Sequence, residues 1–290
     1  MTKKKSNTTI KNFSDASLPN GSKEILYIIK VGGNIIDDEK KLENFLNQFA
    51  SLNSSVQGTM VKKILVHGGG RLATKLAEEL GIPQQLIDGR RITDVETLKI
   101  VTMVFAGYIN KHIVAKLQAN HCQAMGLSGA DGNIIEAHKR IHPSIDYGYA
   151  GDIDTVNAAL LKKLLDEDIT LVIAPITHDK KGQLLNTNAD TIAQEIARSL
   201  SILYDVHLIY SFEKPGVLLD ANDESTVIRS ILPDYYAQLK AEKKIFAGMI
   251  PKIDNAFVAL NSGVKQVTIG KAEDLQKLIN HSAGTNITNG

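Results

Sequence analysis

The sequence predicts an α/β protein, a three-layer αβα sandwich with an open, mostly parallel central sheet. Short apolar runs rich in β-branched residues recur along the chain, and such runs are typical of strands buried on both faces of a parallel sheet. Most of these runs end next to glycine or proline, and several precede a helical repeat of apolar residues. Alternating strands and helices of this kind build a parallel sheet covered by helices on both sides.

Composition narrows the class of function. The chain has 290 residues, of which 43% are hydrophobic and 22% charged, enough for one large core or two lobes. Its 33 basic and 32 acidic residues leave a net charge of +1, so the protein has no large positive charge to attract nucleic acid or an anionic membrane. The single cysteine, Cys122, excludes an intramolecular disulfide, and no apolar run reaches the roughly twenty residues of a membrane span. We expect a cytoplasmic protein that acts on a small molecule, without nucleic-acid or membrane partners.

The elements follow in order along the chain. Residues 1–24 are polar and predict a flexible tail, with a basic docking arm as the alternative. The first strand covers 25–29, and the second, 64–66, precedes a helix with apolar residues at 72, 76 and 80. Further strands are expected at 171–174, 208–210 and 267–269, a hairpin flap at 176–185, and helices at 191–200, 251–261 and 273–279. A change of lobe is expected near residue 200.

Two glycine loops follow the first two strands, Gly32-Gly33 and Gly68-Gly69-Gly70. Ligands of open α/β sheets bind beyond the carboxyl ends of the strands, and glycine loops there expose backbone N–H groups to anions. Tight turns are the alternative explanation of these glycines. The second loop also matches the fingerprint of dinucleotide-binding proteins, and Asp88 lies near the position expected for the acidic residue that binds the ribose. The strand that should precede this acidic residue is not evident.

Charged residues near these loops are the candidate catalytic groups. Lys30 ends an otherwise apolar strand, and Lys252 lies in the first turn of a helix, where a cation opposes the helix dipole. Asn186-Thr187-Asn188-Ala189-Asp190 opens another helix, and capping explains only one of its polar residues. Arg91 is able to fork onto a carboxylate, with a surface arginine as the alternative. The eight histidines show no metal-ligand spacing, so no protein-held metal is expected.

These motifs, in this order, resemble the amino acid kinase family. Lys30-Val31-Gly32-Gly33 is similar to the family's opening motif, which aspartokinases and other relatives share in variant form. Five further motifs are similar to the members that phosphorylate N-acetyl-L-glutamate in arginine biosynthesis: His67-Gly68-Gly69-Gly70, Arg91-Ile92-Thr93, Gly126-Leu127-Ser128-Gly129-x-Asp131-Gly132, Asn186-x-Asn188-Ala189-Asp190 and Gly248-Met249-x-x-Lys252. The resemblance covers the chain from residue 25 to its end.

The resemblance implies a fold and an activity. The fold is the eight-stranded sandwich also found in carbamate kinases, with a lobe at 25–200 for the acyl-amino acid and for dimerisation and a lobe at 201–290 for the nucleotide. The reaction is transfer of a phosphoryl group from ATP, with Mg²⁺ carried by the nucleotide, to the γ-carboxylate of an N-acyl-L-glutamate. The homodimer would form through a helix at 95–119.

The resemblance also assigns roles to individual residues. The catalytic residues would be Lys30, Lys252 and Asp190; the substrate ligands Gly69, Gly70, Arg91 and Asn186; and the phosphate or nucleotide ligands Gly32, Gly33 and Gly68.

Two segments depart from the family pattern. Phe212-Glu213-Lys214-Pro215-Gly216 stands where many members carry Thr-Asp-Val-Pro-Gly, and the segment 283–286 lacks the pattern of arginine-inhibited members. The sequence does not show whether the acyl group of the substrate is acetyl or succinyl. The segment 147–152 is expected to border the pocket for this group. The alternatives are another amino acid carboxylate kinase, a non-catalytic amino-acid or nucleotide sensor on the same fold, and a dinucleotide-binding protein.

Overall fold

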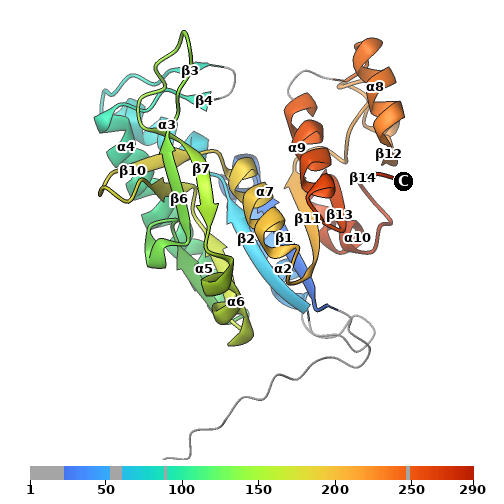
Figure 1. The fold of residues 1–290 in the computed structure, drawn as a ribbon, viewed down its shortest axis with the longest axis horizontal. Helices are drawn as coiled ribbons and strands as arrows, with labels where there is room; N and C mark the ends of the chain where they lie inside the picture. The colour runs from blue at the N-terminus through green and yellow to red at the C-terminus, as the bar shows by residue number, and fades with distance from the viewer. Residues whose placement is uncertain (1–22, 53–60, 88–89, 246–248) are drawn as a thin grey trace, which may run out of the picture.

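A central sheet of eight strands organises the computed structural model, which describes residues 23–52, 61–87, 90–245 and 249–290 (Figure 1). The strand order is β12-β14-β13-β11-β1-β2-β8-β5, and every neighbouring pair is parallel except β13 and β14. The strands are β1 (Ile25–Val31), β2 (Val61–His67), β5 (Ala124–Leu127), β8 (Thr170–Ile173), β11 (Asp205–Phe212), β12 (Ser230–Ile231), β13 (Gln266–Lys271) and β14 (Thr285–Ile287). The prediction of an open, mostly parallel sheet is confirmed.

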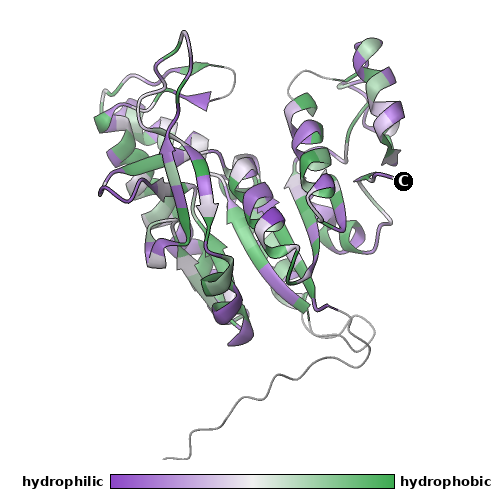
Figure 2. Ribbon diagram, in the orientation of Figure 1, coloured by the Kyte–Doolittle hydropathy of each residue, from purple (hydrophilic) through white to green (hydrophobic). Residues whose placement is uncertain are grey.

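Both faces of the sheet are buried, which explains the continuous apolar runs. In β1, Leu26 and Ile28 belong to one hydrophobic cluster, and Tyr27 and Ile29 belong to the cluster on the opposite face. Successive side chains of a strand point to opposite faces, so a strand covered on both sides has no position for a solvated residue. The strands in the middle of the sheet are accordingly hydrophobic along most of their length (Figure 2).

Helices form the two outer layers. On one face lie α1 (Gly33–Ile36), α2 (Glu39–Ser51), α3 (Gly70–Glu79), α4 (Val95–Val101), α5 (Asn110–Ala119) and α10 (Leu275–Ile279). On the other lie α6 (Ala158–Asp166), α7 (Ala189–Leu200), α8 (Pro233–Ala241) and α9 (Ile250–Asn261). Short 3₁₀ helices occur at Asp131–Asn133, Glu224–Thr226 and Ala272–Asp274. The prediction of three layers is therefore confirmed.

A second, small sheet lies beside the large one. Its strands are β6 (Ile135–Lys139), β7 (Ala150–Val156), β9 (Ile176–His178) and β10 (Leu184–Thr187), closed in the order β10-β7-β6-β9. The predicted hairpin is confirmed because β9 and β10 pair antiparallel. A two-stranded hairpin of β3 (Leu86–Ile87) and β4 (Arg90–Arg91) lies near it. The strands β3, β4, β6 and β7 are partly exposed and were absent from the prediction.

The helix expected at 95–119 is continuous but not uniform. Between α4 and α5 the backbone forms a π-helix at Thr102–Ile109, so the three pieces follow one another without a break. A π-helical segment inside an α-helix shifts the faces that the flanking turns present. Across the described ranges, no helix combines the length and apolar character needed to cross a membrane. The predicted tail up to residue 22, Asp88 and Gly248 lie outside the described residues.

Candidate active site

The two predicted glycine loops meet at one edge of the sheet. β1 and β2 are parallel and in register, with Val31 opposite His67, so both loops begin at the same level. The Gly68 N–H donates to the carbonyl oxygen of Val31 at 3.1 Å. A Cβ atom built on Gly33 would lie 3.8 Å from the backbone nitrogens of both Gly69 and Gly70. The loops therefore face each other, and their backbone N–H groups surround one small space.

Gly69 has a conformation and a packing that only glycine tolerates. Its φ is +145°, and a Cβ atom there would lie 2.2 Å from Cδ1 of Ile109 in the π-helix. Gly69 is also the N-cap of α3, which begins at Gly70. The first N–H groups of a helix have no partner within the helix and carry a partial positive charge. The start of α3 at this loop therefore has N–H groups without a partner inside the helix.

The buried side chain of His67 contacts the backbone of the second glycine loop. His67 is fully buried, and its Nδ1 lies 2.9 Å from the carbonyl oxygen of Gly68. Nδ2 of Asn110 lies 3.2 Å from Nε2 of His67 and also donates to the carbonyl oxygen of Val172. An amide nitrogen is a donor, so Nε2 of His67 accepts, and Nδ1 is protonated and donates to the carbonyl oxygen of Gly68. Burial, the largest cause, lowers the pKa of His67 to about 4, so the ring is neutral at neutral pH.

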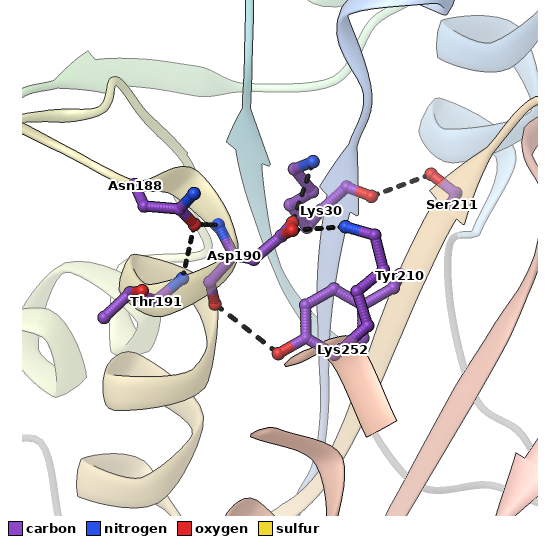
Figure 3. Close-up of polar contacts among 7 residues, drawn as sticks. All are labelled: Lys30, Asn188, Asp190, Thr191, Tyr210, Ser211 and Lys252. Carbon is purple, nitrogen blue, oxygen red and sulfur yellow. Dashed lines mark hydrogen bonds and ion pairs between the residues drawn. The ribbon is translucent and has the colours of Figure 1, made fainter. Parts of the chain in front are cut away.

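Asp190 joins the two predicted catalytic lysines (Figure 3). Its Oδ1 lies 2.8 Å from Nζ of Lys30, and its Oδ2 forms a short ion pair with Nζ of Lys252. Burial opposes ionisation of this carboxyl group, but the two ammonium groups outweigh it and hold the pKa of Asp190 well below its usual range. One carboxylate thus holds two cations side by side, and the group of three keeps a net charge of +1.

The start of α7 sets the position of Asp190. Asn188 is the N-cap, and its Oδ1 accepts hydrogen bonds from the N–H groups of Asp190 at 2.8 Å and Thr191 at 3.1 Å. The hydroxyl of the buried Tyr210 donates to the carbonyl oxygen of Asp190 at 3.4 Å. The side chain of Asp190 is therefore free to face the lysines, since its neighbour performs the capping. Sequence reasoning left open which of the three polar residues caps the helix.

Eight of the ten predicted site residues line one cavity of about 250 Å³: Lys30, Gly33, Gly68, Gly69, Gly70, Arg91, Asn186 and Asp190. Gly32 is not on its wall, and the Gly32 N–H donates to the carbonyl oxygen of Ser211 at 3.1 Å. Lys252 lies on the wall of a neighbouring cavity. Residues from four separate segments of the chain thus meet in a single space, which we call the first cavity.

Arg91 and Asn186 are held rigidly on the wall of the first cavity. The Arg91 guanidinium donates to the carbonyl oxygen of Gly70 and to Oγ1 of Thr74, both at 2.9 Å, and it also bonds Oε1 of Gln84. Nδ2 of Asn186 donates to Oγ1 of Thr93 at 3.0 Å. A guanidinium has five donors, so these contacts orient Arg91 and leave N–H groups for a carboxylate.

Lys252 borders a second cavity of about 330 Å³. Its other wall residues are Phe212, Glu213, Lys214, Gly216, Val217, Leu218, Ala221 and Met249. The segment that departs from the family pattern, Phe212-Glu213-Lys214, therefore lies on this wall. Lys30 lines the first cavity and Lys252 the second, and Asp190 contacts both lysines. The lysine pair consequently stands between the two cavities.

Four other wall residues of the first cavity escaped the sequence prediction, namely Leu86, Arg90, Phe105 and Pro175. Ala150 and Gly151, also on the wall, belong to the segment 147–152 that was expected to border the acyl pocket, and Thr187, Asn188 and Ala189 belong to the predicted motif that ends at Asp190. Most of the four carry no local signal because they are ordinary apolar residues brought in by the hairpin, the π-helix and the small sheet. The doubled arginine at 90–91 was a signal that the prediction used only in part. Within the described ranges, no group of three or more histidine, cysteine or acidic side chains is placed to hold a metal ion.

Comparison with known proteins identifies the family of the chain. The model of the amino acid kinase family matches residues 26–271. Acetylglutamate kinases of Cytophaga hutchinsonii and Phocaeicola vulgatus are 54% and 51% identical to the chain, over 89% and 91% of it and 95% and 98% of their own lengths.

Solved structures share the fold. A Streptococcus mutans protein superposes with a TM-score of 0.73 at 26% identity, covering 91% of this chain and 99% of its own. Carbamate kinase of Giardia lamblia bound to AMP-PNP superposes with a TM-score of 0.66 at 14% identity, covering 93% and 99%. The predicted resemblance is confirmed, and the chain belongs to the amino acid kinase family.

Proposed function

We propose that the protein transfers a phosphoryl group from ATP to the γ-carboxylate of N-acetyl-L-glutamate and so forms an acyl phosphate for arginine biosynthesis. One observation carries this proposal: the Lys30–Asp190–Lys252 group lies between two cavities, with one lysine on the wall of each. Transfer between two substrates needs such an arrangement, in which acceptor and donor approach the same cations from opposite sides.

The first cavity has the groups that an acyl-glutamate requires. Its backbone donors at Gly69 and Gly70 suit the reacting carboxylate, and Arg91 suits the α-carboxylate through a two-pronged contact. Asn186 offers an amide for the acyl-amide group of the substrate. A carboxylic acid of pKa near 4 is already ionised at neutral pH, so the attacking oxygen needs no general base. This agrees with the cavity wall, where Asp190, the only carboxylate among the described lining residues, is committed to two lysines.

The lysines supply charge where the transition state develops it. A phosphoryl group in transfer spreads negative charge over its oxygens, and fixed cations stabilise it without reorganisation. Asp190 acts as a positioning residue, because it keeps both ammonium groups aligned and prevents their mutual repulsion from separating them. The side chains of Lys30 and Asp190 are 14% and 15% exposed, so salt in the solvent screens this pair only weakly.

The second cavity suits the nucleotide. Phe212, Val217, Leu218 and Met249 offer apolar surface for a base, and Lys252 and Lys214 offer cations for phosphates. Mg²⁺ would arrive on the nucleotide phosphates, and its chemistry there is to offset their charge. All wall residues of the first cavity lie between 30 and 190, and all those of the second between 212 and 252. This supports lobes at 25–200 and 201–290 for acceptor and nucleotide.

We also propose that the protein acts in the cytoplasm as a homodimer joined through the helical stretch 95–119. Val95, Met103 and Tyr108 on this stretch are 49%, 56% and 62% exposed, an unusual accumulation of large apolar side chains along one helical segment. Light scattering should report twice the chain mass, and Tyr108→Glu should lower it toward that of one chain. An unchanged mass in this variant would place the contact elsewhere.

The kinase activity is tested by trapping the acyl phosphate with hydroxylamine after incubation with Mg-ATP and N-acetyl-L-glutamate. Lys252→Ala and Lys30→Ala should each lower kcat by about 10²–10³, the usual loss when a group that stabilises transition-state charge is removed. Lys240→Ala is the matched control, because Lys240 pairs with Asp254 on the surface and borders neither cavity.

Three results would contradict the proposal in different ways. Near-normal turnover of both lysine variants would refute their roles. Acyl phosphate from L-aspartate but not from N-acetyl-L-glutamate would indicate another carboxylate kinase of the family. ATP binding by calorimetry without any acyl phosphate would indicate a sensor.

A further inference from the structure

The buried ring of His67 lies between Asn110 and the second glycine loop. Asn110 is 1% exposed, and its partners fix the orientation of its amide. Its Nδ2 donates to the carbonyl oxygen of Val172 at 3.0 Å, and its Oδ1 accepts from Nζ of Lys111 at 3.1 Å. A carbonyl oxygen only accepts and an ammonium only donates, so a flipped amide would lose both bonds. Nδ2 of Asn110 therefore faces Nε2 of His67 as a donor.

This donor decides which ring nitrogen of His67 is protonated. Burial lowers the pKa of His67 to about 4, so the ring has a single proton at neutral pH. Because Nε2 accepts from Asn110, the proton is on Nδ1, which donates to the carbonyl oxygen of Gly68 at 2.9 Å. In the other tautomer, a donor would face the amide of Asn110 and a lone pair would face the carbonyl of Gly68. Mismatched polar groups are costly in a buried site, so the structure holds the Nδ1–H form.

The hydrogen bond from His67 sets the direction of the Gly69 N–H group. The peptide between Gly68 and Gly69 is trans, and in a trans peptide the C=O and N–H groups point in opposite directions. A Gly68 carbonyl that is held toward the buried ring therefore turns the Gly69 N–H away from it. The nitrogen of Gly69 lies 3.8 Å from a Cβ atom built on Gly33, and both glycines line the first cavity. The N–H group thus faces this cavity.

The surroundings of Asn110 leave room for this arrangement. A Cβ atom built on Gly126 would lie 1.9 Å from Oδ1 of Asn110, so a larger residue there would displace the amide. Asn110 begins α5, and the residue before it, Ile109, ends the π-helix and packs against Gly69. Two consecutive residues at the junction of the π-helix and α5 thus contact the glycine loop and the histidine beside it. Such π-helical segments are frequent at functional sites.

We propose that His67 is a positioning residue for the phosphoryl acceptor: held by Asn110 in the Nδ1–H tautomer, it fixes the Gly68–Gly69 peptide so that the Gly69 N–H points at the reacting carboxylate. The proposal rests on the kinase function above and deepens it, because that function places the carboxylate at Gly69. His67 and Asn110 are not among the described wall residues of the first cavity, so His67 acts through the peptide. A donor whose direction is fixed in advance needs no reorganisation when the substrate reacts.

The tautomer is measured without any substrate. In the protein with ¹⁵N-labelled histidine, the ring that is missing from the spectrum of His67→Leu should show a protonated Nδ1 and a bare Nε2 at pH 7. A proton on Nε2 of this ring would overturn the proposal, because Nδ1 would then have no hydrogen to donate to Gly68.

The positioning role is measured with two variants of equal size. Asparagine and leucine have nearly the same shape, but only His67→Asn keeps an N–H donor near the place of Nδ1. The KM for N-acetyl-L-glutamate should be about tenfold to a hundredfold higher in His67→Leu than in His67→Asn, as expected when one hydrogen bond to a charged group is weakened. The KM for Mg-ATP should be the same in both variants, because the loop faces the first cavity.

His138→Asn and His138→Leu are the matched controls. His138 is exposed on β6, pairs with Asp154 and borders neither cavity, so both variants should keep the wild-type KM for N-acetyl-L-glutamate. A merely structural role of His67 would favour leucine, which suits a buried apolar site, or would leave the two His67 variants equal.

The outcomes separate this inference from the proposed function. An equal KM for N-acetyl-L-glutamate in His67→Asn and His67→Leu, or a KM for Mg-ATP that rises as much as that for the acceptor, would overturn the positioning role while the kinase assignment stands. A wild-type protein that forms no acyl phosphate from N-acetyl-L-glutamate would instead overturn the proposed function itself.

Discussion

Protonation of His67 should destabilise the protein in a defined pH window. The ring is fully buried, and its Nε2 faces Nδ2 of Asn110, which is a donor. A proton on Nε2 would set donor against donor and place an unpaired charge in the core. Burial lowers the pKa of His67 from 6.5 to about 4, whereas the unfolded chain keeps the ordinary value. The unfolded state therefore takes up the proton first as the pH falls.

The size of the loss in stability follows from the difference between the pKa of His67 in the folded and the unfolded protein. The contribution of His67 to stability is fully present above pH 6.5, declines by about 1.4 kcal/mol for each pH unit below that, and levels off below about pH 4. Between pH 7 and pH 5 the free energy of unfolding should fall by about 2 kcal/mol on account of this residue. His67→Gln removes the titrating group, so its unfolding free energy should lack this decline.

Two assays check the prediction. Urea unfolding at pH 7 and pH 5 should show a larger loss in the wild type than in His67→Gln, and His142→Gln should behave like the wild type because His142 is exposed. In ¹³C-labelled histidine spectra, the resonance missing from His67→Gln should keep its neutral shift down to about pH 5. A resonance that titrates near pH 6.5, or equal pH dependence of wild type and variant, would refute the reasoning.

Two further predictions concern the glycine loop and the cap of α7. Gly69→Ala should lower both stability, by about 1–3 kcal/mol, and turnover, because its φ is positive and its new methyl group would meet Ile109. Gly81 has a φ of +69° and open space around it, so Gly81→Ala should lose about 1 kcal/mol of stability and keep its turnover. Equal effects of the Gly69 and Gly81 substitutions in thermal melts and kinetics would contradict the role of the contact with Ile109. Asn188→Ala should lose about 1 kcal/mol of stability and much of kcat, since the same cap positions Asp190. Asn157→Ala removes the equivalent cap of α6 and should lower stability without lowering kcat. A lower kcat in both cap variants, or in neither, would contradict the role of Asn188 in positioning Asp190.

Much of the central sheet was predictable from sequence because its signals are local. A strand covered on both faces must be apolar along its length, as β1 and β2 are, and a run of this kind stands out without any knowledge of its neighbours. Glycine loops and helix starts are equally local, since backbone conformation and capping involve only a few adjacent residues. The small sheet was harder to predict, because β6 and β7 are half-exposed and alternate irregularly.

The candidate site was predictable only as a set of residues, and their roles stay a prediction. The motifs named Lys30, Asp190 and Lys252, yet no local rule brings three residues so far apart in the chain into one contact. Nor did any pattern show that Gly32 donates its N–H to Ser211 and stays off the cavity wall, or that Phe105 lies on that wall through the π-helix.

The sequence by itself therefore determined the strands, the glycine loops, the family and the charged residues, because each depends on the chemistry of neighbours in the chain. Only the tertiary structure decided which charges share a partner. Asp190 contacts two lysines, Asp152 contacts Arg140, and Arg91 donates to Gly70, Thr74 and Gln84 on the wall of the first cavity. Pairing of charges depends on distance and burial in space, and the packing of the sheet, the hairpin and the helices sets both.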